Sequence, residues 1–249
     1  MTSKKALIFG VSGQDGCLLA KSLLNQGFRV TGVSRKNLQS FTNFKKLGIN
    51  NDIEIHQGDI TERDRVHKLI EDVQPDEIYN LAAQSSVGKS FSHPTETTKS
   101  IVTGSLNILD VCKVIEFTGK LFFAGSSEIF GNTNKAASMR SIHNPCSPYG
   151  VAKQASLNLV RIYRENFGLN CVTGVLFNHE STYRDDKFVT KKVINSAIDI
   201  KRKKYTKIEL GNISVIRDWG WAPEYVEAMQ LILRDNGNKD QIICTGKKK

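Results

Sequence analysis

The sequence predicts an α/β fold, a Rossmann-like doubly wound parallel sheet with a small, incomplete substrate-binding region. Three observations lead to this prediction. Short apolar runs alternate with amphipathic segments through the first half of the chain, which is typical of a parallel sheet with helices on both faces. A glycine trio, Gly10, Gly13 and Gly16, directly follows the first apolar run. Tyr149 and Lys153 stand four residues apart where a long amphipathic helix is expected to begin.

The expected elements follow in order along the chain. Strands are predicted at Ala6–Phe9, Arg29–Ser34, Ile53–Gln57, Glu77–Leu81, Lys120–Ala124 and Val172–Phe177. Helices are predicted at Asp15–Asn25, Glu62–Val73, Thr97–Val114 and Pro148–Asn166. Beyond Asn178 the pattern is less regular, with a helix at Lys187–Lys203, a short strand at Lys207–Leu210, a helix at Pro223–Arg234 and a strand at Ile242–Thr245. We expect residues 1–178 to form the dinucleotide-binding domain and residues 179–249 to form a partial substrate-binding region interwoven with the sheet.

Composition excludes several classes of protein. The chain has 249 residues, of which 39% are hydrophobic and 24% charged, as in an ordinary soluble globular protein. No apolar run approaches the ~18 residues of a membrane span, and the first run stops at Gly10, too early for a signal peptide; we expect a cytoplasmic protein without a membrane partner. The cysteines are odd in number and scattered without a CxxC motif, which argues against a disulfide framework or a metal site: Cys17, Cys112, Cys146, Cys171 and Cys244.

The net charge of +10 raises the question of nucleic-acid binding. The lysines, however, are dispersed or in small clusters, and no nucleic-acid-binding motif accompanies them. We therefore expect no nucleic-acid partner. A phosphate-rich ligand explains part of the charge, and solvated surface explains the rest.

The glycine trio has the spacing GxxGxxG and stands between the first strand and the first helix. Glycines allow a tight turn and let the backbone approach a pyrophosphate, and the helix N-terminus offers unpaired N–H groups to the anion. Gln14 and Asp15 belong to the same loop. The loop therefore predicts dinucleotide binding.

Arg35 directly follows the second strand, at a position where an NAD-binding enzyme usually has an acidic residue. An arginine suits the 2′-phosphate of NADP, which favours NADP; the alternative is a surface arginine. Asp59 and Ile60 close the third strand, where a carboxylate can accept a hydrogen bond from the adenine amino group. Leu81, Ala82 and Gln84 lie at the end of the fourth strand. Small side chains there would let the cofactor lie close to the backbone.

Residues four apart lie on one face of a helix, so Tyr149 and Lys153 can point into one site. A phenol has a pKa near ~10, and a nearby ammonium favours the phenolate, so the pair suits proton removal from an alcohol. Ser126 and Glu128 close the fifth strand, and a carboxylate beside such a pair suits elimination of water. The alternatives are an exposed tyrosine and lysine on an amphipathic helix, and a helix-capping serine followed by a first-turn glutamate.

These motifs resemble those of the extended short-chain dehydrogenase/reductase superfamily. Within it, the resemblance is to the GDP-mannose 4,6-dehydratases. The stretches that carry the narrower resemblance are Gly13-Gln14-Asp15-Gly16, Leu176-Phe177-Asn178-His179-Glu180-Ser181 and Arg217-Asp218-Trp219-Gly220 leading to Tyr225-Val226-Glu227-Ala228-Met229.

The resemblance implies a dehydratase that acts on a GDP-sugar with transient hydride transfer to NADP. Tyr149 would take the proton from the sugar O4, Lys153 would lower the pKa of that tyrosine, and Glu128 would remove the C5 proton and help expel the C6 hydroxyl as water. It also implies that Leu176, His179 and Arg184 lie near the cofactor. The resemblance also implies a set of residues that contact the GDP-sugar: Ser85 of the loop after the fourth strand, Asn178, Val189, Lys192 and Arg217. Homodimers or homotetramers are expected, with the loop after Arg35 at the tetramer contact.

Some stretches depart from the family pattern. Met139 stands where an acidic residue is usual, and Thr182-Tyr183-Arg184-Asp185 replaces a Pro-Arg-Arg-Gly stretch. Relatives continue beyond Thr245-Gly246, so we expect a truncated relative with an incomplete sugar-nucleotide site. Two alternatives therefore stay open: another dehydratase, epimerase or reductase of the superfamily, and an NADP-binding relative without turnover.

Overall fold

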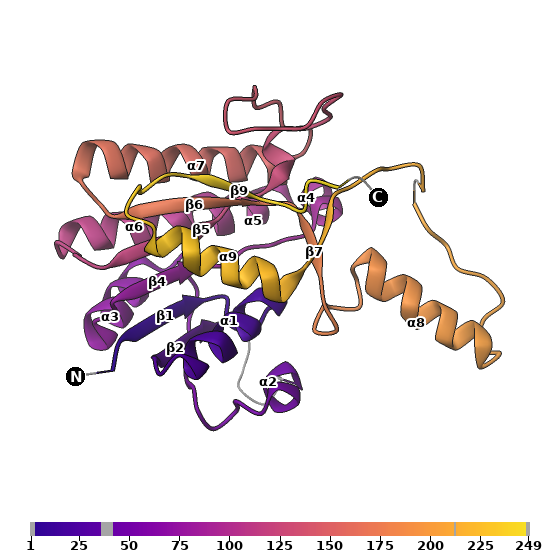
Figure 1. Cartoon of the computed structure of the whole chain (residues 1–249), viewed down its shortest axis with the longest axis horizontal. Coiled ribbons are helices and arrows are strands. Elements are labelled where there is room, and N and C mark those ends of the chain that lie inside the picture. The colour runs from indigo at the N-terminus through magenta and orange to yellow at the C-terminus, as the bar shows by residue number, and fades with distance from the viewer. Residues whose placement is uncertain (1–2, 36–41, 212, 248–249) are drawn as a thin grey trace.

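The structure is a computed structural model that describes residues 3–35, 42–211 and 213–247. Its centre is a seven-stranded sheet in the order β3-β2-β1-β4-β5-β6-β9, in which every neighbouring pair is parallel (Figure 1). The strands are β1 (Lys5–Phe9), β2 (Arg29–Ser34), β3 (Glu54–Gln57), β4 (Glu77–Asn80), β5 (Lys120–Ala124), β6 (Cys171–Leu176) and β9 (Gln241–Ile243). The predicted doubly wound parallel sheet is confirmed.

Two hydrophobic cores cover the two faces of this sheet, and β1 contributes to both. Ala6 and Ile8 belong to one core, and Leu7 and Phe9 belong to the other, as the two-residue period of a strand requires. The first core is closed by α1 (Gln14–Asn25), α2 (Thr42–Leu47) and α9 (Ala222–Arg234). The second is closed by α3 (Arg63–Val73), α6 (Gly104–Val114) and α7 (Pro148–Phe167). Because both faces are buried, β1 reads as a continuous apolar run.

The helix expected at Thr97–Val114 is longer and less regular than predicted. It comprises α5 (Pro94–Thr98), a π-helical turn η2 (Lys99–Thr103) and α6, and it follows a short helix α4 (Val87–Ser92). Pro94 at the first helical position starts it, since proline suits a position whose N–H has no partner in the helix. A 3₁₀ turn η3 (Ser127–Ile129) follows β5.

The region beyond Asn178 contains a second, two-stranded parallel sheet, formed by β7 (Asn178–Glu180) and β8 (Trp219–Trp221). Between these strands, α8 (Val189–Lys201) projects away from the main sheet and has no buried residue (Figure 1). The predicted strand Lys207–Leu210 is wrong, because no neighbouring strand pairs with that segment. The predicted helices Lys187–Lys203 and Pro223–Arg234 are confirmed, with ends that differ by one or two residues.

All five cysteines are free thiols, and within the described part of the chain no helix is long and apolar enough to cross a membrane. Residues 36–41, where the predicted tetramer contact falls, lie outside the described residues.

Candidate active site

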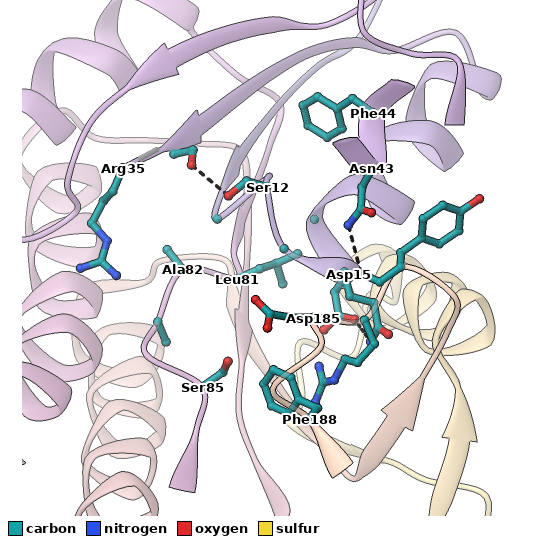
Figure 2. A pocket seen from close by; sticks show the side chains of 18 of the residues that line it. Ser12, Asp15, Arg35, Asn43, Phe44, Leu81, Ala82, Ser85, Asp185 and Phe188 are labelled. Carbon is teal, nitrogen blue, oxygen red and sulfur yellow. Dashed lines mark hydrogen bonds between the residues drawn. The ribbon is translucent and has the colours of Figure 1, made fainter. Parts of the chain in front are cut away.

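A cavity of about 620 Å³ opens where the carboxyl ends of β1, β2, β3 and β4 meet (Figure 2). Ligands of doubly wound sheets bind at this edge. The predicted site residues that line it are Gly10, Gly13, Gln14, Asp15, Gly16, Arg35, Asp59, Ile60, Leu81, Ala82, Ser85 and Arg184. Those that do not line it are Gln84, Ser126, Glu128, Tyr149, Lys153, Leu176, Asn178, His179, Val189, Lys192 and Arg217.

The glycine loop brings backbone to the edge of the cavity. Gly10 has a φ of +85°, and a Cβ there would lie 2.7 Å from the backbone nitrogen of Ala82. A Cβ on Gly16 would lie 2.6 Å from the Cα of Val11. Gly13, at the N-cap of α1, leaves the first-turn N–H groups without a side-chain cap. These amides and the positive end of the helix dipole face an anion that enters the cavity.

At the end of β2, the Arg35 guanidinium lies 3.9 Å from a carboxylate oxygen of Asp59, and its side chain is 55% exposed. The other carboxylate oxygen of Asp59 accepts a hydrogen bond from the backbone N–H of Thr61. The hydroxyls of Ser12 and Ser34 are 2.9 Å apart beside Arg35 (Figure 2). This end of the cavity therefore combines an exposed cation with hydroxyls and a fixed carboxylate.

The first turn of α7 sets the position of Tyr149. Ser147 caps the helix by accepting a hydrogen bond from the N–H of Gly150, and Pro148 occupies the first helical position. Tyr149 is buried, and burial raises the pKa of its phenol to about 12. A hydrogen bond with Ser126 acts in the opposite direction, while the carboxylate of Glu128 raises the pKa further. Ser126, Glu128 and Tyr149 therefore form one cluster.

Lys153 lies one turn further along α7, with its ammonium 5.7 Å from the centre of the Tyr149 ring. The ammonium donates a hydrogen bond to the carbonyl oxygen of Ala124 at 2.7 Å. Burial lowers the pKa of Lys153 to about 8. The expected lowering of the Tyr149 pKa is not seen in this structure, because burial disfavours the charged form of both groups.

Glu128 lies in η3, and Gly150 lets α7 approach it closely. A Cβ on Gly150 would lie 2.7 Å from the carbonyl oxygen of Glu128 and 2.9 Å from Pro145. The carboxylate of Glu128 is 3.9 Å from the guanidinium of Arg217, which comes from the segment before β8. A residue predicted for proton transfer and a residue predicted for the sugar nucleotide are thus neighbours.

His179 lies behind the glycine loop rather than in the cavity. Its Nε2 is 2.9 Å from Asp15 Oδ2, and its Nδ1 is 2.7 Å from the carbonyl oxygen of Phe177. Gln14 donates to the carbonyl oxygen of His179 and accepts from the hydroxyl of Ser181. These bonds join the loop before α1 to β7.

The other predicted cofactor residues have different surroundings. Arg184 lines the cavity, pairs with Glu180 at 3.2 Å and stacks over the ring of Phe188. Leu176 is a buried residue of the first hydrophobic core. The amide of Gln84 faces inward and bonds with Ser86 and Thr97.

The predicted sugar-nucleotide residues are not gathered in one cavity. Val189 is 49% exposed at the start of α8. Lys192 donates to the carbonyl oxygen of Glu209, and Arg217 donates to that of Ile216. Asn178 pairs with Trp219 in the two-stranded sheet. Of this set, Ser85 lines the cavity, at the end of β4.

Several cavity residues were not predicted from the sequence. Asn43 of α2 and Asp185 and Phe188 of the segment between β7 and α8 lie on the opposite side from Arg35 (Figure 2). The same two segments also contribute Lys46 and Tyr183. Asn43 donates to the carbonyl oxygen of Tyr183 and so connects these two segments. Ser100 of the π-helical turn was also missed. No sequence motif marks these residues, because their place depends on how distant segments pack.

Comparisons with known proteins agree with this architecture. The family model described as GDP-mannose 4,6 dehydratase matches residues 7–249. A protein named GDP-mannose 4,6 dehydratase 2 from Caenorhabditis elegans is 40% identical over 98% of this chain and 67% of its own length. One with the same name from Arabidopsis thaliana is 38% identical over 97% of this chain and 68% of its own length. The solved structure of a dTDP-glucose 4,6-dehydratase from Streptomyces venezuelae with NAD bound has a TM-score of 0.87 at 19% identity, covering 98% of this chain and 77% of that one.

Proposed function

The chain belongs to the GDP-mannose 4,6-dehydratase family, and from this premise we propose that it binds NADP and converts GDP-mannose to GDP-4-keto-6-deoxy-mannose and water. The observation that carries the proposal is the cluster of Ser126, Glu128 and Tyr149, in which the N–H of Glu128 donates to the hydroxyl of Ser126 and Tyr149 packs with Ala83, a residue that lines the cavity. Tyr149 can remove a proton from an alcohol, and Glu128 is a carboxylate suited to elimination. Because the two are neighbours, both can act on one substrate.

The residues of the cavity fit a dinucleotide. Gly10 and Gly16 occupy positions where a side chain would meet backbone, so the loop can come close to a pyrophosphate. The uncapped first turn of α1 offers N–H groups to the same anion. The crevice extends to both sides of β1, as a molecule with two nucleotide halves requires.

NADP rather than NAD is supported by the end of β2. Arg35 stands where NAD-binding enzymes place an acidic residue, and it lines the cavity. A guanidinium can form paired hydrogen bonds with a phosphate, whereas a ribose hydroxyl needs an acceptor such as a carboxylate. The Arg35 guanidinium lies 3.9 Å from Asp59 at this end of the cavity.

Each proton in the reaction has an acceptor among the residues of this chain. Tyr149 takes the proton from O4, with its phenol bonded to Ser126. Glu128 takes the proton from C5 and gives it to the C6 hydroxyl, which leaves as water. The chemistry that the bound nicotinamide supplies is the storage of one hydride, taken from C4 and returned to C6. The proton held by Tyr149 then goes to C5, which returns the tyrosine to its state before the reaction. The overall change is the loss of one water with no net oxidation.

The sugar nucleotide would be held by residues from the end of β4, from β7, from α8 and from the segment before β8. Arg217 lies beside Glu128, and Lys192 lies on α8, so both cations can meet a diphosphate. Ser85 and Asn178 supply polar contacts to the sugar, and Val189 contributes an apolar one. We also propose a cytoplasmic protein that forms homodimers or homotetramers.

The experiment that tests the function is incubation of the purified chain with NADP⁺ and GDP-mannose, followed by mass analysis of the nucleotide sugar. Loss of one water is the expected result, and the Glu128→Gln variant should bind NADP⁺ normally without forming product. A wild-type chain that binds NADP⁺ but leaves GDP-mannose unchanged would contradict the dehydratase and leave a binding protein. Product formed with other nucleotide sugars alone would move the function to another member of the superfamily.

A further inference from the structure

A π-helical turn interrupts the helix that follows α4. The turn, η2 (Lys99–Thr103), joins α5 and α6 without a break in the helix. Such turns are rare, and they are often found at functional sites because they insert one extra residue and change the direction of the side chains around it. Here the turn lies next to the candidate cofactor site, since its residue Ser100 lines the cavity.

The hydroxyl of Ser100 bonds in two directions. It donates to the carbonyl oxygen of Thr97 at 3.0 Å and accepts from the backbone N–H of Gln84 at 3.4 Å. Ser100 is 7% exposed, and Gln84 is buried too. A buried N–H that loses its acceptor is costly, so this bond constrains the backbone of the cavity-lining loop Leu81–Ser85.

The neighbours of Ser100 in the helix contact two other parts of the site. Ile101 packs in one apolar cluster with Tyr149 and Ala83. At Gly104, directly after the turn, a Cβ would lie 2.6 Å from a side-chain carbon of Ile60, which lines the cavity. Within five residues, therefore, the helix contacts the loop after β4, the proposed catalytic tyrosine and the end of β3.

We propose that this π-helical turn is a positioning element of the cofactor site, in which Ser100 fixes the loop after β4. The proposal rests on the proposed binding of a dinucleotide. A dinucleotide lies across the strand ends with one half on each side of β1. The loop after β4 and Arg35 at the end of β2 lie on opposite sides of β1. Ser100 therefore acts on the half of the cofactor that is farther from Arg35.

The test compares two ligands in the full chain: NADP⁺ and its adenosine half, 2′,5′-ADP. We expect Ser100→Ala to weaken NADP⁺ by up to about tenfold, because binding must then order again a loop that has lost one buried hydrogen bond, and to leave the affinity for 2′,5′-ADP unchanged. Ser100→Thr keeps a hydroxyl and should retain affinity for NADP⁺. Thr98→Ala, which removes an exposed hydroxyl from the same helix, is the matched control and should change neither affinity.

A second measurement does not depend on any ligand. Amide hydrogen exchange at Gln84 should be faster in Ser100→Ala than in the wild type, while exchange in α6 and the midpoint of thermal unfolding change little. Unchanged exchange at Gln84, or equal weakening of both ligands, would overturn the proposal. A wild type that binds neither ligand would reject the proposed cofactor, and the exchange measurement would still decide the role of Ser100.

Discussion

Asp15 and His179 are 164 positions apart in the sequence, yet Nε2 of His179 donates a hydrogen bond to Oδ2 of Asp15 at 2.9 Å. The other ring nitrogen faces the carbonyl oxygen of Phe177. Both partners are acceptors, so this geometry suits a ring with two protons. Burial lowers the pKa of His179, but Asp15 outweighs burial and raises it accordingly. The result is an ion pair that fastens the start of α1 to β7, with side chains 9% and 20% exposed.

Replacement of His179 by Gln should destabilise the protein by about 3 kcal/mol, because it leaves a largely buried carboxylate without its cation. Chemical denaturation measures the change. His67→Gln is the control, since His67 and Glu71 form an exposed pair in α3 and such pairs contribute only about 0.3–0.5 kcal/mol. If the two substitutions change the free energy of unfolding equally, the buried pair contributes no more to stability than the exposed pair.

The same pair predicts how the difference between wild type and His179→Gln depends on pH. Burial lowers the pKa of His179, but Asp15 outweighs burial and raises it above 6.5, so this contribution is complete below pH 6.5 and is lost as pH rises through the raised pKa. Burial raises the pKa of Asp15, but His179 outweighs burial and lowers it below 3.8, so this contribution is lost as pH falls through the lowered pKa. The stability difference should therefore be greatest between pH 3.8 and 6.5. A difference that grows toward alkaline pH would contradict this account.

Lys153 should make stability increase with pH in the alkaline range. Its pKa is about 8 in the folded chain, against an ordinary value of 10.5 for lysine, so between these values the unfolded chain binds more protons. The stability of the wild type relative to Lys153→Met should rise by about 3 kcal/mol across this range. Denaturation at a series of pH values tests this, and a flat difference would mean that the ammonium is not desolvated.

Gly150→Ala should disturb the cluster around Tyr149. The added methyl would lie 2.7 Å from the carbonyl oxygen of Glu128, so η3 and α7 must separate. We expect a loss of about 1–3 kcal/mol of stability, as for overpacking, together with a fall in turnover larger than any fall in cofactor affinity. Gly88→Ala is the control, because a Cβ there meets only the Ser86 hydroxyl at 3.9 Å. If Gly150→Ala behaves like Gly88→Ala, the close approach has no catalytic consequence.

Arg35→Ala should weaken NADP⁺ by roughly tenfold to a hundredfold and leave NAD⁺ within about twofold, because hydrogen bonds to a charged phosphate contribute about 1.5–3 kcal/mol. Titration of both cofactors gives the ratio. Arg29→Ala removes an exposed arginine at the opposite end of β2 and should leave the ratio unchanged. If Arg35→Ala weakens the binding of NADP⁺ and NAD⁺ equally, Arg35 contacts a part of the cofactor that both molecules have, and not the 2′-phosphate.

Local patterns in the sequence were sufficient to predict the sheet. Apolar runs bounded by glycines mark strands that are buried on both faces, and Gly10 and Gly16 mark the close approach at the first turn. The predicted cofactor residues at the ends of β1, β2, β3 and β4 line one cavity, apart from Gln84, since the carboxyl ends of parallel strands share one edge. The positions of Ser126, Glu128 and Tyr149 follow from the end of β5 and the start of α7.

Other features depend on packing between distant segments. Gln84 was expected to face the cofactor, but its amide is used inside the protein by Thr97 and Ser86. The raised pKa of Tyr149 arises from burial, which a motif does not encode. Asn43 reaches the cavity only because α2 meets the segment at Tyr183.

In the parallel pairing of β7 and β8, Trp219 lies opposite Asn178, so the chain that leaves β7 after Glu180 returns two residues away from that point along the pair. Loop-closure entropy grows only slowly with length, so an excursion anchored in this way can lengthen, shorten or be exchanged between relatives at little cost to the sheet. α8, which carries two of the residues proposed to meet the sugar nucleotide and has no buried residue, can therefore vary between relatives without disturbing the sheet. The strand ends proposed to meet the dinucleotide have no such freedom, because each is also part of a core.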